Sequence, residues 1–125
     1  MELDLEGERG EAVLAELLGA LRAMLALDII HGDLSPYNIL VRGGRPVIID
    51  LPQAADARYS SNADALLARD IRNVLGYFQK RGIGSGCDPE READALWADY
   101  RSGALYRERD AAELAKEWGL ADVAY

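Results

Sequence analysis

The sequence is poor in cysteine and histidine, with one residue of each, Cys87 and His31. A single cysteine cannot form a disulfide within the chain, and a structural zinc ion needs about four ligands of these types. Long apolar runs are also missing, since residues 17–30 are interrupted by charge and fall short of the roughly 20 residues of a membrane-spanning helix. The acidic start, residues 1–8, has no secretory character. We therefore expect a protein of the reducing cytoplasm with no membrane partner.

The sequence has fewer basic than acidic residues. The 14 Lys and Arg residues stand against 22 Asp and Glu residues, a formal net charge of −8, which opposes attraction to the phosphates of nucleic acids. We therefore expect no direct nucleic-acid binding. The 125 residues, of which 50% are hydrophobic, suffice for one compact core, and no long linker or internal repeat divides them. The chain is accordingly predicted to form a single domain, residues 1–125.

Two helices are predicted from apolar residues that recur at steps of three and four. The first spans residues 8–28. The second begins near Asn62, which can cap exposed backbone N–H groups, and stops at Gly82. The apolar faces consist of Leu14, Leu17, Leu18, Leu21, Met24 and Leu25 in the first helix, and of Leu67, Ile71, Val74 and Phe78 in the second.

Two shorter helices and one hairpin complete the expected fold. Residues 39–41 and 46–49 favour β-strands, and the glycines between them supply the positive φ of a tight reversal. A helix should open at Asp88-Pro89, and another should run from Asp110 to Gly119 with Glu113 completing a capping box. The predicted fold class is therefore mainly α with a small β-hairpin. The residues of the third helix expected to face inward are Leu96, Trp97 and Tyr100.

The polar residues of chemical interest surround the hairpin. The segment His31-Gly32-Asp33-Leu34-Ser35-Pro36-Tyr37-Asn38 precedes it, and Asp50 follows its second strand. Phosphoryl transfer needs a base to orient the attacking hydroxyl and oxygen ligands for Mg²⁺. Asp33, Asn38 and Asp50 supply these groups. The hairpin should return Asp50 beside Asn38, so that one ion can contact both.

This order resembles the protein-kinase catalytic loop, H-x-D-x-x-x-x-N, followed by a metal-binding aspartate. Most kinases continue that aspartate as Asp-Phe-Gly, whereas this chain has Asp50-Leu51-Pro52. His-Gly-Asp-Leu-Ser at 31–35 and Ile-Ile-Asp-Leu-Pro-Gln at 48–53 resemble the RIO family of atypical serine/threonine protein kinases. The resemblance covers about residues 4–82, and residues 83–125 would form a helical C-terminal extension. The match is extended by residues 62–63, 66–70 and 73–74.

The RIO resemblance implies a fold and a set of roles. The fold would be a protein-kinase-like C-terminal lobe of the α+β superfamily. With ATP and Mg²⁺, the enzyme would phosphorylate a Ser or Thr hydroxyl of a protein substrate, or run an ATPase-like cycle through phosphorylated Asp50. Asp33 would be the catalytic aspartate, with Asn38 and Asp50 as the metal ligands. His31 would orient the loop.

Two further residues take roles from the same resemblance. Asp70, on the second helix, would brace the backbone of the catalytic loop; the alternative is an ordinary surface ion pair with Arg69. Ser35 stands where other protein kinases have a lysine that meets the transferring phosphate, so we expect it beside ATP with weaker charge stabilisation. Residues 51–61 form only a short segment before the second helix, which argues against substrate docking in the usual kinase groove.

Nothing before Asp33 resembles the Gly-rich strand pair or the strand lysine of the N-terminal lobe that clamps ATP. We therefore expect the chain to lack that lobe, to belong to a complete enzyme and to be weak or inactive alone. One alternative is a natural half-kinase, a binding module whose uncovered surface takes a partner or a second copy of itself. The other is a small-molecule phosphotransferase of the aminoglycoside or choline kinase type. Leu51 disfavours it, because those relatives usually have an aromatic residue there.

Overall fold

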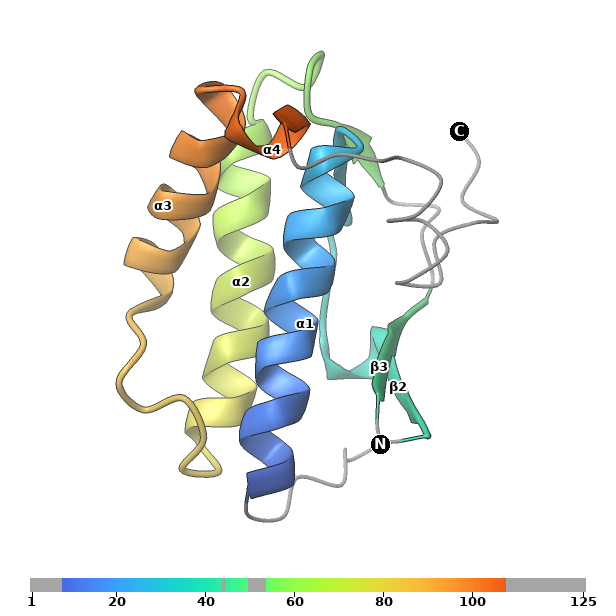
Figure 1. Cartoon of the computed structure of the whole chain (residues 1–125), viewed down its shortest axis with the longest axis vertical. Coiled ribbons are helices and arrows are strands. Elements are labelled where there is room, and N and C mark those ends of the chain that lie inside the picture. Colours follow the sequence, from blue (N-terminus) through green and yellow to red (C-terminus); the bar gives the residue numbers. More distant parts are fainter. Residues whose placement is uncertain (1–7, 44, 50–53, 108–125) are drawn as a thin grey trace.

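The computed structural model describes residues 8–43, 45–49 and 54–107. Three longer helices lie side by side, with α2 between α1 and α3, and in this view the β2–β3 hairpin lies on the side of α1 away from α3 (Figure 1). The chain is thus mostly helical with small antiparallel sheets, as predicted. The elements are α1 (Glu8–Ala26), β1 (Ile29–Ile30), the 3₁₀ helix η1 (Pro36–Asn38), β2 (Ile39–Arg42), β3 (Arg45–Ile48), β4 (Ala55–Asp56), α2 (Ala63–Gln79), α3 (Pro89–Arg101) and α4 (Ala104–Arg107).

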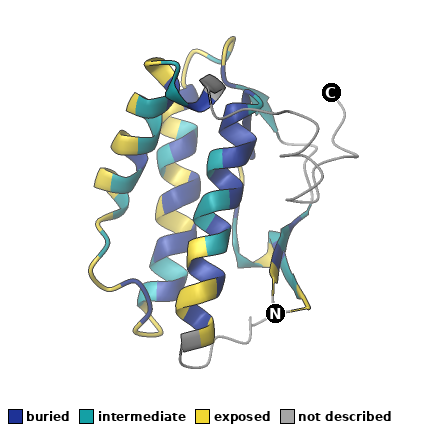
Figure 2. Ribbon diagram, viewed as in Figure 1, coloured by how far each residue is buried: buried dark blue, intermediate teal, exposed yellow. Residues whose placement is uncertain are grey.

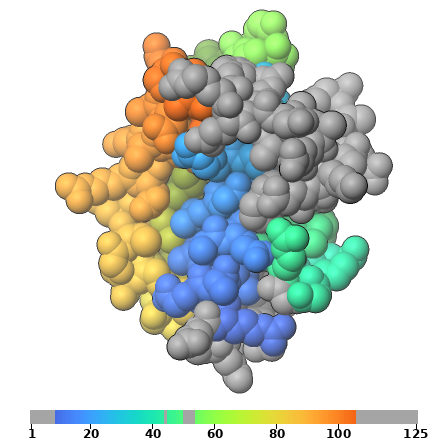
Figure 3. Space-filling model, in the orientation of Figure 1, coloured from blue at the N-terminus to red at the C-terminus, as the bar shows by residue number. Residues whose placement is uncertain are grey.

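The helix α1 supplies the largest share of the apolar core. Its predicted apolar face is buried apart from Leu18, which is partly exposed (Figure 2). In the space-filling view, its solvent side stays visible between α3 and the β2–β3 hairpin (Figure 3). The helix ends two residues earlier than predicted, because Asp28 adopts a φ of 66° and turns the chain into β1. None of the helices among the described residues is long and apolar enough to span a membrane.

The predicted hairpin is present. Strands β2 and β3 pair antiparallel with Ile39 opposite Ile48, and Gly43 in the turn has a φ of 59°. The expectation of one hairpin was nevertheless incomplete, because β1 pairs with β4 in a second two-stranded sheet. Each of these strands has two residues, too few to produce a readable alternation of apolar and polar side chains.

The helix α2 has the predicted buried stripe of Leu67, Ile71, Val74 and Phe78. Asn62 is its N-cap residue, but the prediction that its side chain caps the helix is wrong. The Asn62 side chain makes no capping bond, and its Oδ1 instead accepts the Ser60 hydroxyl at 2.9 Å. The C-terminal stop is confirmed, since α2 ends at Gln79 and Gly82 reverses the chain with a φ of 75°.

The helix α3 opens as predicted, with the Asp88 side chain accepting the Glu90 N–H at 3.0 Å and Pro89 in the first turn. Tyr100 is buried, whereas Leu96 and Trp97 are half-buried against the core. The short helix α4 was not predicted, and the helix expected at residues 110–119 lies outside the described residues.

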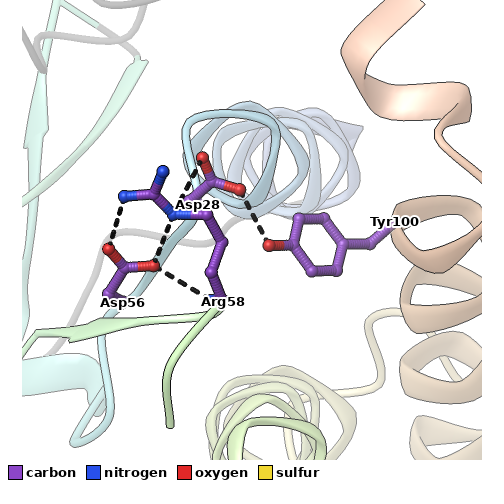
Figure 4. Close-up of polar contacts among 4 residues, drawn as sticks. All are labelled: Asp28, Asp56, Arg58 and Tyr100. Atoms are coloured by element: carbon purple, nitrogen blue, oxygen red, sulfur yellow. Dashed lines mark hydrogen bonds and ion pairs between the residues drawn. The ribbon is translucent and has the colours of Figure 1, made fainter.

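A polar cluster at one end of the bundle joins three segments (Figure 4). The Tyr100 hydroxyl donates to Asp28 at 2.8 Å, while the Arg58 guanidinium lies 3.7 Å from Asp28 and 2.8 Å from Asp56. Hydrogen bonding by Arg58 holds the pKa of Asp56 below its usual value. These contacts tie α3 and β4 to the turn that follows α1.

Substitution of Gly84 tests how closely the turn after α2 packs against Leu14 of α1. The φ of Gly84 is 69°, and a Cβ added there would lie 2.6 Å from Leu14 Cδ2, whereas Gly82 has a φ of 75° with open space around it. Gly84→Ala should lower the free energy of unfolding by about 2–3 kcal/mol, because backbone strain adds to a clash, and Gly82→Ala by about 1 kcal/mol. Gly86→Ala, with neither feature, is the control. Urea unfolding measures all three, and equal losses would contradict the packing described.

Candidate active site

The loop that carries Asp33 lies between β1 and η1, against α2. Its apolar anchors, Ile30 and Leu34, are buried, whereas the Asp33 side chain is exposed. Within the described part of the chain, the Asp33 carboxylate makes no hydrogen bond or ion pair. Buried residues on both sides of Asp33 thus hold the loop in place, while Asp33 presents its carboxylate to solvent.

Asp70 holds this loop from α2. Its Oδ2 accepts the Gly32 N–H at 2.8 Å and its Oδ1 accepts the Leu34 N–H at 3.0 Å, so the carboxylate binds the backbone on both sides of Asp33. Asp70 is only 1% exposed, which excludes the alternative of a surface ion pair with Arg69. Burial raises the pKa of Asp70, and the two N–H donors partly oppose that effect.

Asn73 is a second contact from α2 to the loop, and sequence reasoning gave it no role. Its side-chain Nδ2 donates to the Leu34 carbonyl at 3.3 Å. Asn73 follows Asp70 by three residues, a spacing that puts both side chains on one face of a helix. The three-residue spacing from Asp70 was therefore the sequence signal that could have identified Asn73 as a contact of the loop. Together the two residues bind one acceptor and two donors of the loop backbone.

His31 connects the loop to the end of β3. The ring is 1% exposed; Nδ1 accepts the Asp33 N–H at 3.3 Å, and Nε2 lies 3.0 Å from the Ile49 carbonyl oxygen. Because Nδ1 is the acceptor, Nε2 must carry the proton and donate to Ile49. The imidazole therefore links Asp33 to Ile49, the residue that precedes Asp50.

Ser35 and Asn38 bind each other in a capping box around η1. Asn38 Oδ1 accepts both the Ser35 N–H and the Ser35 hydroxyl, each at 3.1 Å, and the Ser35 Oγ accepts the Tyr37 N–H at 3.3 Å. The oxygen expected to ligate a metal thus also orders the turn. To bind a cation through Oδ1, Asn38 would release at least one of these donors, since a carbonyl oxygen has two lone pairs.

Asp50 lies outside the described residues, so the convergence of Asp33, Asn38 and Asp50 stays a prediction. The described backbone extends to Ile49, the residue before Asp50 in the sequence, and the Ile49 N–H donates to the Asn38 carbonyl at 2.8 Å. Among the residues described, no three His, Cys, Asp or Glu side chains gather as a metal site. The donors present, a carboxylate and an amide oxygen, are of the type that Mg²⁺ prefers.

A test of the loop anchor is removal of the Asp70 carboxylate. Asp70→Ala should lower the free energy of unfolding by about 2–5 kcal/mol, because two buried N–H groups lose their acceptors. Asp64→Ala is the matched control, an exposed acid in the first turn of the same helix, and should cost no more than about 1 kcal/mol. Urea unfolding measures both. Equal small losses would show that the Asp70 bonds contribute nothing; should Asp70→Ala fail to fold, Asp70→Asn replaces it.

Asp70 should also give stability a distinct pH dependence. Its carboxyl titrates near pH 3.8 in the unfolded chain and at a higher pKa in the folded protein. The folded state therefore holds the proton more tightly, and stability falls as pH rises through the folded pKa. The free energy of unfolding of wild type minus that of Asp70→Asn, which does not titrate, should be largest at low pH and decline toward neutrality. A difference that rises with pH would contradict the burial-dominated pKa.

Comparison with known proteins gives one family. The family model of the RIO domain matches residues 2–91. The RIO-type serine/threonine-protein kinase Rio1 of Thermoplasma acidophilum is 40% identical over 85 residues, 68% of this chain and 45% of that protein. Rio1 of Haloferax volcanii is 38% identical over 68 residues, 54% of this chain and 23% of the relative.

The chain is also similar to a relative named Rio2. The RIO-type serine/threonine-protein kinase Rio2 of Methanocaldococcus jannaschii is 50% identical over 58 residues, 46% of this chain and 21% of the relative. The matched region thus spans less than half the length of each of these three relatives. The stretch matched by the family model, residues 2–91, includes the loop at 31–38 together with Asp70 and Asn73. The chain belongs to the RIO family.

Proposed function

We propose that this chain supplies the catalytic loop of an ATP-dependent protein kinase that transfers the γ-phosphate of ATP to a Ser or Thr hydroxyl. The supporting observation is an exposed carboxylate, Asp33, between two backbone amides fixed by one buried carboxylate, Asp70. The relatives named as serine/threonine-protein kinases support the reaction class. A carboxylate held in this way is preorganised to accept a hydrogen bond from an attacking hydroxyl.

In this proposal each residue has one task. Asp33 orients the substrate hydroxyl and accepts its proton, while Asp70 and His31 keep Asp33 in position through backbone contacts. Asn38 and Asp50 would hold Mg²⁺, which supplies neutralisation of phosphate charge when bound. Asn38 would exchange a Ser35 hydrogen bond for the ion. Ser35 lines the phosphate side of the loop without adding positive charge.

The lobe assignment is part of the same proposal. We place the whole chain, residues 1–125, in one kinase-like C-terminal lobe, of which residues 2–91 match the family model. Contacts of α3 with α2, and of Tyr100 with Asp28, support a single unit that continues past that limit. An ATP-clamping N-terminal lobe would come from polypeptide beyond this sequence, which is consistent with the greater length of the relatives. We also propose that the protein resides in the reducing cytoplasm, where its single cysteine, Cys87, would remain a thiol.

The alternatives have less support. A half-kinase that self-associates needs an exposed apolar face, and the large hydrophobic residues exposed among those described are Tyr37 and Tyr59. They belong to different segments and do not make a continuous apolar element. A small-molecule phosphotransferase finds no support in the relatives, which are named as protein kinases.

A chimera tests the proposal. The stretch of the Thermoplasma acidophilum relative that aligns with this chain is replaced by the corresponding residues of the chain, and transfer of ³²P from [γ-³²P]ATP to a protein substrate is measured. The chimera should transfer phosphate, and Asp33→Asn or Asp50→Asn should lower kcat by about 100-fold or more, because base and metal ligands act in the transition state. The 125-residue chain alone should bind Mg-ATP weakly and transfer little.

The control is Asp64→Asn, an exposed acid of α2 away from the loop, which should leave kcat unchanged. Circular dichroism checks that each variant folds. Asp33→Asn with wild-type kcat would remove the role of Asp33, and phosphorylation of an aminoglycoside or choline in place of a protein would favour the small-molecule alternative.

A further inference from the structure

The C-terminal half of α2 and the turn after it form a stretch of this acidic chain that carries basic residues and no acidic ones. Residues 71–87 contain no Asp or Glu, although the chain as a whole has 22 of them and a net charge of −8. The same stretch contains Arg72, Lys80 and Arg81, all exposed. A local patch of opposite sign to the rest of the molecule acts on a charged partner only at short range.

These residues line a groove of about 520 Å³ that begins at the catalytic loop. One wall is formed by Ser35 and Pro36, and the other by the C-terminal half of α2 and the residues that follow it. Ser35 is two residues beyond Asp33 in the chain. The groove, which we call the α2 groove, therefore starts at the loop that carries Asp33.

Gly76 lies within α2, and its Cα borders the α2 groove. A Cβ added at this position would meet no atom within 4 Å, and Gly76 does not need a positive φ. Glycine lowers helix stability relative to alanine, and neither packing nor backbone conformation requires it here. What Gly76 provides is space, because any larger side chain would project into the groove.

The cations of the groove are arranged differently from one another. The Arg81 guanidinium lies 3.6 Å from the centroid of the Tyr77 ring and donates to the Tyr77 carbonyl at 3.0 Å, so it is held against one wall. Arg72 contacts Glu90 at 3.2 Å. The Lys80 ammonium has no hydrogen bond or ion pair with any described residue. The site thus offers one cation held against its wall, Arg81, and beside it a second cation, Lys80, that has no partner among the described residues.

The shape and charge favour an acidic polypeptide over a nucleic acid. A nucleic-acid strand is a long uniform polyanion, and beyond the groove it would meet the negative charge that gives the chain its −8. A short segment with a few Asp or Glu residues can place its charge within the groove alone. Tyr77 and Pro36 also give apolar contact to the backbone and side chains of a peptide.

We propose that the α2 groove binds the acidic flank of a protein substrate while the substrate's Ser or Thr hydroxyl reaches Asp33. This inference rests on the proposed kinase function, and it assigns that function a substrate class: a hydroxyl residue neighboured by Asp or Glu. The groove would take the place of the usual kinase groove, for which the short 51–61 segment leaves little material. Arg81, Lys80 and Gly76 are the residues that determine this specificity.

Fluorescence anisotropy with the 125-residue chain, without nucleotide, tests the proposal. The probe is a labelled peptide with one serine flanked by Asp and Glu, compared with the same peptide carrying Asn and Gln, and with a single-stranded oligonucleotide. The acidic peptide should bind about tenfold more tightly than the neutral one, and the preference should shrink as salt is added. The double variant Lys80→Glu, Arg81→Glu should abolish the preference.

Two variants separate the groove from general charge. Gly76→Leu fills the groove without changing charge, should raise helix stability, and should weaken acidic-peptide binding about fivefold or more. Arg101→Glu makes the same type of charge change on the exposed last turn of α3 and should alter affinity less than about twofold. Each variant's fold is checked by circular dichroism.

The outcomes are distinct. The proposal would be overturned if neither Gly76→Leu nor the double charge reversal changed the affinity for the acidic peptide. Tighter binding of the oligonucleotide than of the acidic peptide would also overturn it. Since peptide binding is measured without ATP, a chimera that fails to transfer phosphate would refute the proposed function while the groove's selectivity stood. Transfer by the chimera with charge-independent peptide binding would refute the groove alone.

Discussion

One buried carboxylate, Asp70, fixes the loop that carries Asp33, the catalytic residue of the proposed function. Asp70 accepts the N–H groups of Gly32 and Leu34, which lie on either side of Asp33 and more than thirty residues away in sequence. Burying a carboxylate is unfavourable unless its oxygens find donors. Here the loop backbone supplies two N–H donors to the Asp70 carboxylate. The carboxylate of the helix and the amides of the loop therefore satisfy each other's hydrogen-bonding capacity. The position of the exposed Asp33 follows from that exchange.

Other buried polar contacts extend this arrangement to the rest of the fold. The His31 side chain connects the loop to Ile49 at the end of β3. The Asp28 carboxylate, which follows α1, accepts the Tyr100 hydroxyl of α3. In the described part of the chain, every buried side-chain nitrogen or oxygen has a hydrogen-bond partner. Fully satisfied networks of this kind define a single geometry, because each alternative leaves a donor or acceptor unpaired. The small core and these polar contacts can therefore position a loop that presents Asp33 to solvent.

The sequence predicted the elements with long, periodic signals. The helices around Leu17 and Ile71 and the Gly43 turn follow from spacing and backbone preference alone. It did not predict the pairing of β1 with β4, because strands of two residues carry no periodicity. It was wrong on the Asn62 cap, because Ser60 competes for the same side-chain oxygen.

The candidate site divides in a similar way. Spacing and family resemblance identified Asp33, Asn38, Asp50 and Asp70 as residues of interest. They did not give the Asn73 contact to Leu34 or the mutual capping of Ser35 and Asn38, which depend on how α2 and η1 are oriented. The α2 groove could not be predicted from the sequence, because Pro36 and Lys80 are distant in the chain and meet only in the folded structure. The roles of the site residues stay predictions.

Amide hydrogen exchange of Gly32 and Leu34 tests the central claim most directly. If Asp70 holds the loop, both amides should exchange as slowly as interior amides of α2, because they open only when the helix and loop separate. The exposed Gly86 is the internal reference for an amide in an open turn. Exchange of Gly32 and Leu34 at the rate of Gly86 would mean that the loop is not anchored, and the account of Asp33 would fail with it.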